Sequence, residues 1–442
     1  MPILVTLLAA YLIGSVPFGF IVARLRGVDI FKQGSGNIGA TNVGRVLGRR
    51  FGALVFVLDF FKGMVPVLLG HWVAEHWPSA PLDEFPAGSL ETAAGLAAFL
   101  GHLFPIYLRF RGGKGVATGT GVVAVLAPLP MVVAAVAWGL VVLAFRYVSL
   151  ASIGAALVLV LAQLRLHAAA PSGFVADPRS WFCVLAAVMV VVRHRTNIRR
   201  LVEGRENRLK ETRFMAAATR IVHLFALCLW FGGTVFFSFI AAPSLFARFE
   251  EAPNLPANAR PWFPSSPLFA KQDEAIKGPR EQGTLAAGYA VGGIFPTLFL
   301  LQAACGFAAV ATALPWMRAQ SHRRLHGWRV SVLLAALSCV LAGWPLQTHV
   351  RELQGERHNK TFAYLTASDD LDQKRTEMQE ARKTFGLWHL ASLLLSFVMI
   401  LLVGLALALA AWMPSDPAPT AATPEPASTV AAADFPTESL EH

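Results

Sequence analysis

The segment Phe51–Ala74 reads FGALVFVLDFFKGMVPVLLGHWVA and decides the fold class. It is apolar over the roughly 20 residues that a helix needs to cross a bilayer, and its only charged residues are Asp59 and Lys62. These two residues are three positions apart, so a helix places them on one face, and ionisable groups inside a membrane span normally pair or serve function. The segment therefore predicts a membrane-spanning helix that contains a structural ion pair.

The composition of the whole chain agrees with this prediction. Hydrophobic residues make up 55% of the 442 residues and charged residues only 15%, whereas soluble domains carry about 25% charged residues. Further apolar runs lie at residues 3–23, 91–108, 116–129, 130–145, 150–168, 180–193, 214–242, 285–314, 328–350 and 385–413. We expect an all-α integral membrane protein with about 11 transmembrane helices. Seven would lie in residues 1–213 and four in residues 214–413, followed by a disordered tail at 414–442.

The basic residues predict the orientation. They gather in the segments after the first, third, fifth and seventh runs, whereas residues 75–90 contain no Lys or Arg. The positive-inside rule then places these four segments in the cytoplasm and the N-terminus outside. The first run has no basic residues before it, so we expect a retained span in a bacterial inner membrane rather than a cleaved signal. The net charge of +11 thus reflects topology rather than nucleic-acid binding.

The four cytoplasmic segments carry similar polar groups: GSGNIGATNVGR at Gly34–Arg45, RFRGGKGVATGTG at Arg109–Gly121, RYVSLAS at Arg146–Ser152 and RHRTNIRRLVEGRENR at Arg193–Arg208. Glycine-rich loops with a lysine at a helix start suit phosphate, because backbone N–H groups can approach its oxygens. The nucleotide-binding pattern GxxxxGK[ST] is absent. Small residues also let membrane helices pack closely, so each loop alone remains open to that explanation.

The sequence contains no evident nucleophile or acid–base dyad. It has no GxSxG motif and no His followed five residues later by Asp, and its four cysteines lie in apolar runs without metal-ligand spacing. We therefore expect no metal and no cofactor. The residues predict a site for phosphorylated ligands beside hydrocarbon, in a reaction that needs little acid–base help from the protein.

Several motifs of the first half resemble those of a known family. GSGNIGATNVGR, LDFFKG, GHLFPIYLRFRGGKGVAT, RYVSLASI and HRTNIRRLVEGRE are similar to the motifs of the acyl-phosphate-dependent glycerol-3-phosphate acyltransferases, the PlsY family, in order and at family spacing over residues 1–210. The resemblance implies a seven-helix membrane fold and acyl transfer from acyl phosphate to the 1-hydroxyl of glycerol 3-phosphate. The products would be 1-acyl-glycerol 3-phosphate and phosphate, in the first step of phospholipid synthesis. It also implies a partnership with membrane lipid and with PlsX, the soluble enzyme that makes acyl phosphate.

The resemblance also assigns residues to the site. Those implied to be catalytic are Ser35, Arg45, Lys114, His194 and Asn197. Those implied to bind substrate are Asn37, Thr41, Gly112, Gly113, Gly115 and Ser149. Glu206 matches an acidic position of the family and is expected to act as a structural brace. His102 also matches, and a satisfied interfacial histidine explains it equally well.

The second half departs from this pattern. RIVHLFALCLWFGGTVFFSFIAAPSLF, at Arg220–Phe246, resembles the start of a four-helix bacterial membrane domain of unknown function. His223 in this run could face His389 in the last run, either as a haem or metal pair or, as we favour, as polar core packing. We expect an accessory or regulatory role for this half. A transporter of a phosphorylated lipid precursor is the alternative for the whole chain, although the two halves show no repeat.

Overall fold

The structure, a computed structural model, describes residues 2–77, 85–167, 173–263, 266–270, 278–318 and 322–412. Within these ranges every regular element is a helix and none is a strand, which confirms the predicted all-α class. Nine helices in these ranges are long and apolar enough to cross a bilayer. The protein is therefore a multi-pass membrane protein. The predicted tail at 414–442 lies outside the described residues.

The elements of the first half, in chain order, are α1 (Pro2–Ser15), α2 (Phe18–Leu25), α3 (Ala40–Leu47), α4 (Arg49–His76), α6 (Ser89–Leu103), η1 (Ile106–Leu108), α7 (Val116–Leu126), α8 (Pro128–Phe145), α9 (Val148–His167), α10 (Gly173–Ala176), α11 (Pro178–Arg193) and α12 (Arg195–Val202). Those of the second half are α13 (Arg213–Phe236), a π-helical turn η2 (Phe237–Ala241), α14 (Ala242–Glu251), the short turns η3 (Ala252–Asn254), η4 (Ala257–Ala259) and η5 (Pro267–Ala270), α15 (Pro279–Ala313), η6 (Leu314–Arg318), α16 (Arg323–Leu365) and α17 (Leu371–Ala411).

Two predicted spans differ from a simple bilayer-crossing helix. The run at 116–129 forms α7, which has only 11 residues and is about 16 Å long, half the hydrocarbon thickness. It ends at Leu126 because Pro128 starts the next helix. The run at 180–193 forms α11, which qualifies as a span only together with α12 after a bend of 55°. The division into seven plus four spans remains a prediction.

Glycines set the distance between α7 and its neighbour α4. A Cβ on Gly121 would lie 1.9 Å from the carbonyl oxygen of Phe60, and a Cβ on Gly63 would lie 2.1 Å from that of Thr118. The two helix backbones are therefore in direct contact, as is typical of membrane helices joined through small residues. Because Gly63 and Thr118 lie side by side, the N-terminal end of α7 is level with the middle of α4. The loop before α7 thus reaches deep between the helices.

The predicted ion pair inside α4 is confirmed. The Nζ of Lys62 lies 2.7 Å from Oδ1 of Asp59, and both side chains are buried. The same ammonium donates a hydrogen bond of 2.7 Å to the carbonyl oxygen of Val16, at the break between α1 and α2. A charge pair of this kind leaves no net charge in apolar surroundings, and its mutual attraction offsets part of the cost of burying two ions while it ties α4 to the first span.

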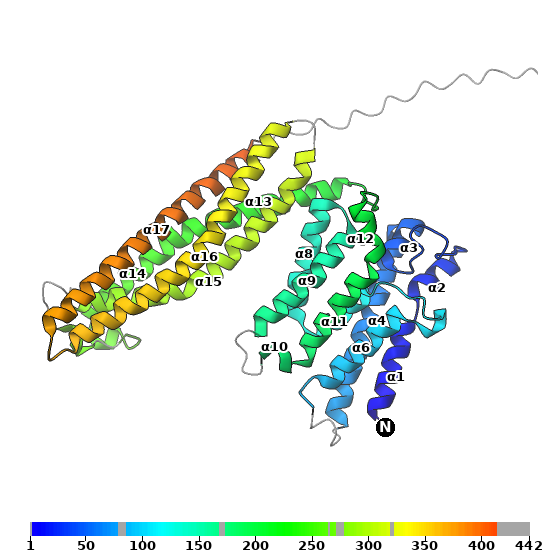
Figure 1. The fold of residues 1–442 in the computed structure, drawn as a ribbon, viewed down its shortest axis with the longest axis horizontal. Coiled ribbons are helices and arrows are strands. Elements are labelled where there is room, and N and C mark those ends of the chain that lie inside the picture. Colours follow the sequence, from blue (N-terminus) through cyan, green and yellow to red (C-terminus); the bar gives the residue numbers. More distant parts are fainter. Residues whose placement is uncertain are drawn as a thin grey trace, which may run out of the picture.

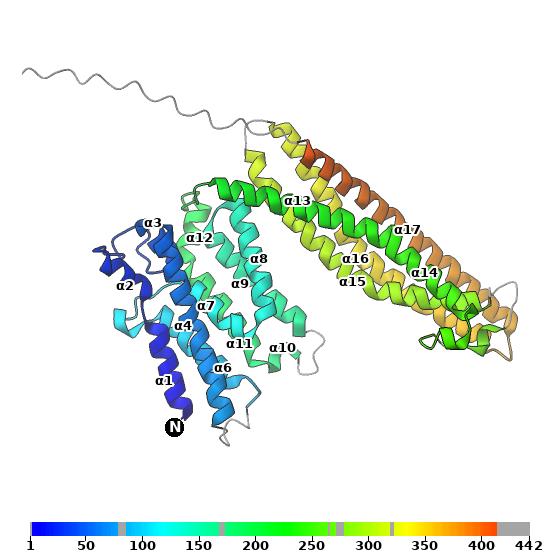
Figure 2. The ribbon, with the colours of Figure 1, turned by 180° about the vertical axis from the view of Figure 1, so that it is seen from behind.

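The second half forms an elongated helical bundle beside the helices α1–α12, as Figures 1 and 2 show. Its core contains Trp230, Phe299 and Leu333. The two halves are in contact where α8 meets α15 and η6. Helices α16 and α17 have 43 and 41 residues, so each is about twice as long as the hydrocarbon layer is thick.

We predict that Gly121→Ala destabilises the protein. Its methyl group would overlap the carbonyl of Phe60, and overpacking of this kind costs about 1–3 kcal/mol. The matched control is Gly139→Ala in α8, where an added Cβ has no neighbour within 4 Å and helix propensity rises. Thermal unfolding in detergent should give a lower Tm for Gly121→Ala only. Equal melting temperatures for the two variants would contradict the close contact of α4 and α7.

Candidate functional site

The first half contains a cavity of about 320 Å³ that is polar on one side and apolar on the other. We call its polar side the polar edge; it is lined by Ser35, Asn37, Thr41, Asn42, Arg45, Lys114, Ser149, His194, Asn197, Glu206 and Asn207. We call its apolar side the apolar slot; it is lined by Met131, Ala134, Ala135, Ala155, Ala156, Leu159, Ala186 and Ala187. Every predicted site residue except Gly112 and Gly113 lines this cavity. The structure thus brings together residues from four segments that are far apart in the sequence.

The first loop is folded around the side chain of Asn42. Its Oδ1 accepts a hydrogen bond of 2.8 Å from the backbone N–H of Ser35, and its Nδ2 donates one of 2.9 Å to the carbonyl of Asn37. Gly34 and Gly36 have φ values of 61° and 67°, which a glycine adopts without strain. Asn42 therefore positions Ser35 and Asn37 at the polar edge. Reasoning from the sequence missed this residue, although asparagines beside turns often bond the local backbone.

The glycine loop is built differently from a phosphate cradle. A Cβ on Gly113 would lie 2.2 Å from the imidazole of His102, and a Cβ on Gly112 would lie 2.3 Å from the carbonyl oxygen of the same residue. The carbonyl groups of Gly112 and Gly113 accept hydrogen bonds of 2.8 and 3.0 Å from Arg193. These glycines serve close packing, and the fixed loop delivers Lys114 to the polar edge.

Gly115 ends the loop and begins α7. Its φ of 84° is left-handed, and a Cβ on it would lie 2.5 Å from the ring of Phe99. Unlike the two glycines before it, Gly115 lines the cavity. Its backbone is therefore a part of the site that only glycine can supply.

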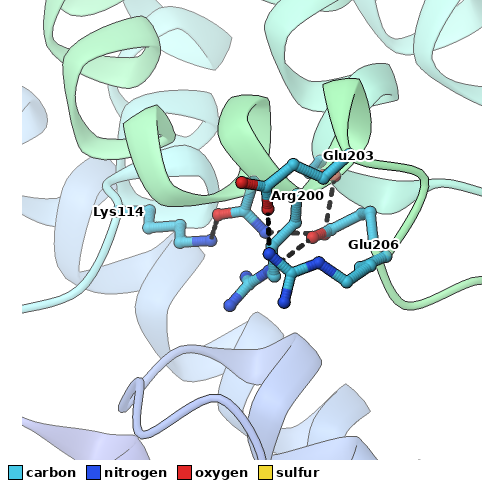
Figure 3. Close-up of polar contacts among 7 residues, drawn as sticks. Lys114, Arg200, Glu203 and Glu206 are labelled. Carbon is cyan, nitrogen blue, oxygen red and sulfur yellow. Dashed lines mark hydrogen bonds and ion pairs between the residues drawn. The ribbon is translucent and has the colours of Figure 1, made fainter.

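Lys114 is held by a hydrogen-bond network whose centre is Glu206 (Figure 3). The ammonium of Lys114 donates to Oδ1 of Asn197, and Nδ2 of Asn197 donates to Oε1 of Glu206 at 2.6 Å. The same carboxylate accepts from Oγ of Ser149 at 2.9 Å and from Nε of Arg200 at 2.8 Å. Each donor meets an acceptor, so the network fixes the orientation of the Asn197 amide. This geometry supports the predicted role of Glu206 as a brace.

The network changes the titration of its ionisable groups. Burial and, to a smaller extent, the charges of Arg200 and Arg45 lower the pKa of Lys114 to about 8, although Glu206 opposes the change. Burial alone would raise the pKa of Glu206, but hydrogen bonds from Arg200, Asn197 and Ser149 outweigh it and hold that pKa below its ordinary value. The site therefore presents a lysine that titrates near neutral pH beside a carboxylate that stays ionised.

His194 lies at the bend between α11 and α12. Its Nδ1 donates a hydrogen bond of 2.7 Å to the carbonyl oxygen of Val190, one turn earlier. This contact fixes the ring and leaves Nε2 as the nitrogen available for a ligand, and the residue lines the cavity. Arg45, from α3, completes the cationic part of the polar edge.

The apolar slot runs between α7, α8, α9 and α11. Six of the eight residues that define it are alanines, and their small side chains leave space between the facing helices. Where the slot meets the polar edge, Nε1 of Trp138 donates to Oγ of Ser152 at 3.3 Å, which satisfies the polar atom of each side chain. Ser152 belongs to the third polar segment singled out in the sequence, whereas reasoning from the sequence missed Trp138 and Asn207, because only the fold shows that they face the cavity.

The expectation that His223 faces His389 is wrong. Nε2 of His223 accepts a hydrogen bond of 3.1 Å from Arg329. The residue beside His389, Trp388, contacts His349 at 4.9 Å, and His349 is twenty residues along α16 from Arg329, or about 30 Å. The two histidines therefore lie far apart along the bundle. Among the described residues, no three His, Cys, Asp or Glu side chains form a group that could hold a metal ion.

We predict that Glu206→Gln lowers kcat/KM of the acyl transfer expected from the sequence about 10- to 100-fold. A glutamine offers one acceptor oxygen in place of two and removes the charge opposite Arg200, and such charge-assisted bonds are worth about 1.5–3 kcal/mol. The matched control is Glu203→Gln, because Glu203 pairs only with the exposed side chains of Arg199 and Arg205. Steady-state kinetics should separate the two variants once thermal unfolding has shown that both keep the Tm of the wild-type protein. Equal turnover would show that the network does not support the site.

Comparisons with known proteins agree with this arrangement. The family model described as glycerol-3-phosphate acyltransferase matches residues 4–204. The glycerol-3-phosphate acyltransferase of Anaeromyxobacter sp. (strain Fw109-5) is 44% identical over 208 residues, which are 47% of this chain and 96% of the relative. That of Aquifex aeolicus (strain VF5) is 43% identical over 199 residues, which are 45% of this chain and 95% of the relative.

A crystal structure of PlsY, an integral membrane glycerol 3-phosphate acyltransferase in its glycerol 3-phosphate form, is 40% identical. The match covers 48% of the present chain and 96% of the PlsY chain, with a TM-score of 0.41. The sequence relatives are matched along almost their whole length, and the family model spans the first three cavity-forming segments and the start of the fourth. The chain therefore belongs to the glycerol-3-phosphate acyltransferase family and is an acyltransferase.

Proposed function

We propose that residues 1–213 transfer an acyl group from acyl phosphate to the 1-hydroxyl of glycerol 3-phosphate and release phosphate. The observation that carries the proposal is a single cavity that joins a cationic polar edge to an apolar slot. Arg45 and Lys114 at the polar edge suit the two phosphate groups, and the slot suits the acyl chain. Family membership supports the same acceptor, because the relatives are glycerol-3-phosphate acyltransferases.

The reaction needs orientation and charge stabilisation more than a protein base. The hydroxyl oxygen attacks the acyl carbonyl carbon, the bond from that carbon to the phosphate oxygen breaks, and the departing phosphate takes the hydroxyl proton. The carboxylates that line the cavity are Asp59 and Glu206, and they are engaged with Lys62 and with Arg200, respectively. Neither is available as a strong base, which supports proton transfer to the leaving phosphate. The site then acts by holding two reactants together and stabilising the developing charge.

Substrate contacts follow from the geometry of each group. Lys114 and Arg45 would hold phosphate oxygens, while Ser35, Thr41 and Asn37 would contact them from the first loop. Because Nδ1 of His194 carries the proton that is donated to Val190, Nε2 would accept a hydrogen bond from a substrate hydroxyl. Asn197 and Ser149 face the same space, and their side chains are oriented by Glu206. Gly112 and Gly113 would contribute by placing Lys114 rather than by contacting a phosphate.

A transporter is less well supported than an enzyme. Glycines that line a passage need free space beside them. Gly112 and Gly113 have none, because a Cβ built on either residue would lie within 2.3 Å of an atom of His102. The loop is therefore closed by packing.

The charge pattern of the loops supports an inner-membrane location with the site facing the cytoplasm and the N-terminus outside. That side is where a soluble supplier of acyl phosphate, PlsX, would act. We assign the bundle of residues 214–413 an accessory role, supported by its contact with α8, the helix that lines the apolar slot.

The test is a reconstituted reaction of the purified full chain with a long-chain acyl phosphate and glycerol 3-phosphate. We expect stoichiometric phosphate and 1-acyl-glycerol 3-phosphate, and no product when acyl-CoA replaces the acyl phosphate. Lys114→Ala should lower kcat/KM at least tenfold, because one charge-assisted contact to a phosphate is lost. Comparable rates with both donors would refute the assignment of acyl phosphate.

The pKa of Lys114 predicts how the reaction depends on pH. Below pH 8 the side chain is a phosphate-binding ammonium, and above pH 8 it becomes a neutral amine, so the charged fraction falls about tenfold between pH 7 and pH 9. We expect kcat/KM for acyl phosphate, which reports groups of the free enzyme, to fall over the same range. Lys114→Arg should be slower at neutral pH but should lack this fall, because a guanidinium stays charged. A flat wild-type profile from pH 7 to pH 9 would contradict the prediction.

A further inference from the structure

His102 is a buried histidine with an unused hydrogen-bonding atom. Its side chain is 3% exposed, and its Nδ1 has no hydrogen-bond partner among the residues that the structure describes. On its other side the ring packs against Gly113, where an added Cβ would lie 2.2 Å from Nε2. Nearly all buried polar side-chain atoms in proteins are bonded to protein or water, so an unused one beside a cavity calls for a partner.

Asp59 lies next to this unused nitrogen. Its Oδ1 is 3.9 Å from Nδ1 of His102, which is too long for a direct hydrogen bond. Both residues line the cavity. One oxygen atom that can both donate and accept would satisfy the two groups together, by accepting from Nδ1–H and donating to the carboxylate. A hydroxyl group has this property and a phosphate dianion does not.

The local charge also favours a hydroxyl. Lys62 neutralises Asp59 at 2.7 Å and is itself fixed by the carbonyl of Val16. The pair therefore offers no net positive charge to a phosphate, and its carboxylate would repel one. The cations Arg45 and Lys114 lie on the polar edge. The cavity thus has a cationic part for phosphate and a neutral hydrogen-bonding part.

The two parts lie within reach of one small molecule. The ring of His102 contacts Gly113, and Gly113 directly precedes Lys114, the cation of the glycine loop. Glycerol 3-phosphate carries, besides its reacting 1-hydroxyl, a second hydroxyl on the carbon between that group and its phosphate ester. Lys114, His102 and Asp59 all line the same cavity, so an acceptor whose phosphate binds Lys114 would have its middle carbon inside the cavity that the pair also lines.

We propose that Nδ1 of His102 and the carboxylate of Asp59 form a hydroxyl subsite that binds the non-reacting secondary hydroxyl of glycerol 3-phosphate. The inference rests on the proposed function and extends it, because it names the part of the acceptor that this pair recognises. The subsite would also orient the acceptor, since a molecule held at both its phosphate and its middle carbon presents the 1-hydroxyl in one direction.

The experiment compares two acceptors with the full-length wild-type protein and a long-chain acyl phosphate. The acceptors are glycerol 3-phosphate and 3-hydroxypropyl phosphate, which lacks only the secondary hydroxyl. We expect kcat/KM to be at least about tenfold lower for the second acceptor, because it leaves two buried polar groups unpaired. Equal kcat/KM for the two acceptors would overturn the subsite and leave the proposed function intact. No transfer to either acceptor would overturn the proposed function and the subsite with it.

Two substitutions of His102 separate recognition from folding. An asparagine places its Nδ2 near the position of the histidine Nδ1, whereas a glutamine reaches toward the position of Nε2. His102→Asn should therefore keep the wild-type ratio of kcat/KM between the two acceptors. His102→Gln should bring this ratio to within about twofold of unity, because it slows the reaction of glycerol 3-phosphate but not that of 3-hydroxypropyl phosphate. The matched control is His76→Gln, since the ring of His76 bonds the carbonyl of Trp72 away from the cavity.

The ratio of the two rates is the deciding readout. A folding defect lowers the rates with both acceptors equally and leaves their ratio unchanged, so it cannot imitate the predicted loss. If His102→Gln shows the same ratio of kcat/KM for the two acceptors as the wild-type protein, Nδ1 does not contact the hydroxyl and the subsite is wrong. If Nδ1 instead forms a direct hydrogen bond with Asp59 in solution, the wild-type protein has equal kcat/KM for the two acceptors. That result overturns the subsite without any variant.

Discussion

A membrane protein that binds phosphate must carry cations into apolar surroundings, and each such cation needs a compensating partner. Three cationic side chains meet this requirement in three different ways. Lys62 is paired with Asp59, Arg193 is bonded to two backbone carbonyls, and Lys114 reaches a carboxylate only through the amide of Asn197. The first two are fully committed to the protein. Lys114 reaches its carboxylate through an intervening amide; burial is the main cause that lowers its pKa to about 8, and its charge remains available to a ligand.

This distribution of charge explains the shape of the site. Lys62 ties α4 to the break between α1 and α2, and Arg193 ties α11 to the loop that precedes the half-length helix α7. A full-length helix in the same place would fill the region that the glycine loop now enters. The loop therefore brings a cation to the level of the middle of α4, next to the helices that line the apolar slot. A lipid substrate can reach this position with its alkyl chain still in apolar surroundings.

Much of this architecture could be predicted from the sequence. Apolar runs predicted the helices, and the spacing of Asp59 and Lys62 predicted their pair, because both depend only on local periodicity. The convergence of four polar segments followed from counting spans between basic loops. The number of spans was harder, because hydropathy does not reveal that α7 stops after 11 residues or that α11 bends into α12.

Other features depend on contacts that no local pattern contains. Glycines at a loop have the same spacing whether they cradle a phosphate or admit a neighbouring ring, so the packing of Gly113 against His102 was not foreseeable. The wrong pairing of His223 with His389 has a similar cause. Helical phase indicates which face a residue such as His389 occupies, but it does not indicate the height of that residue on a helix of 41 residues. Asn42 was missed because its partners are backbone atoms of a loop whose path the sequence does not give.

The left-handed glycine at the start of α7 has a consequence for inhibition. Gly115 lines the cavity with a backbone conformation and a neighbouring phenylalanine ring that together exclude any other residue. A compound whose affinity comes from this stretch of main chain would bind a surface that point mutation cannot remodel without disturbing the fold. Resistance would have to arise at the surrounding side chains, which include Lys114 and Glu206, the residues that we propose the enzyme needs for its own substrates.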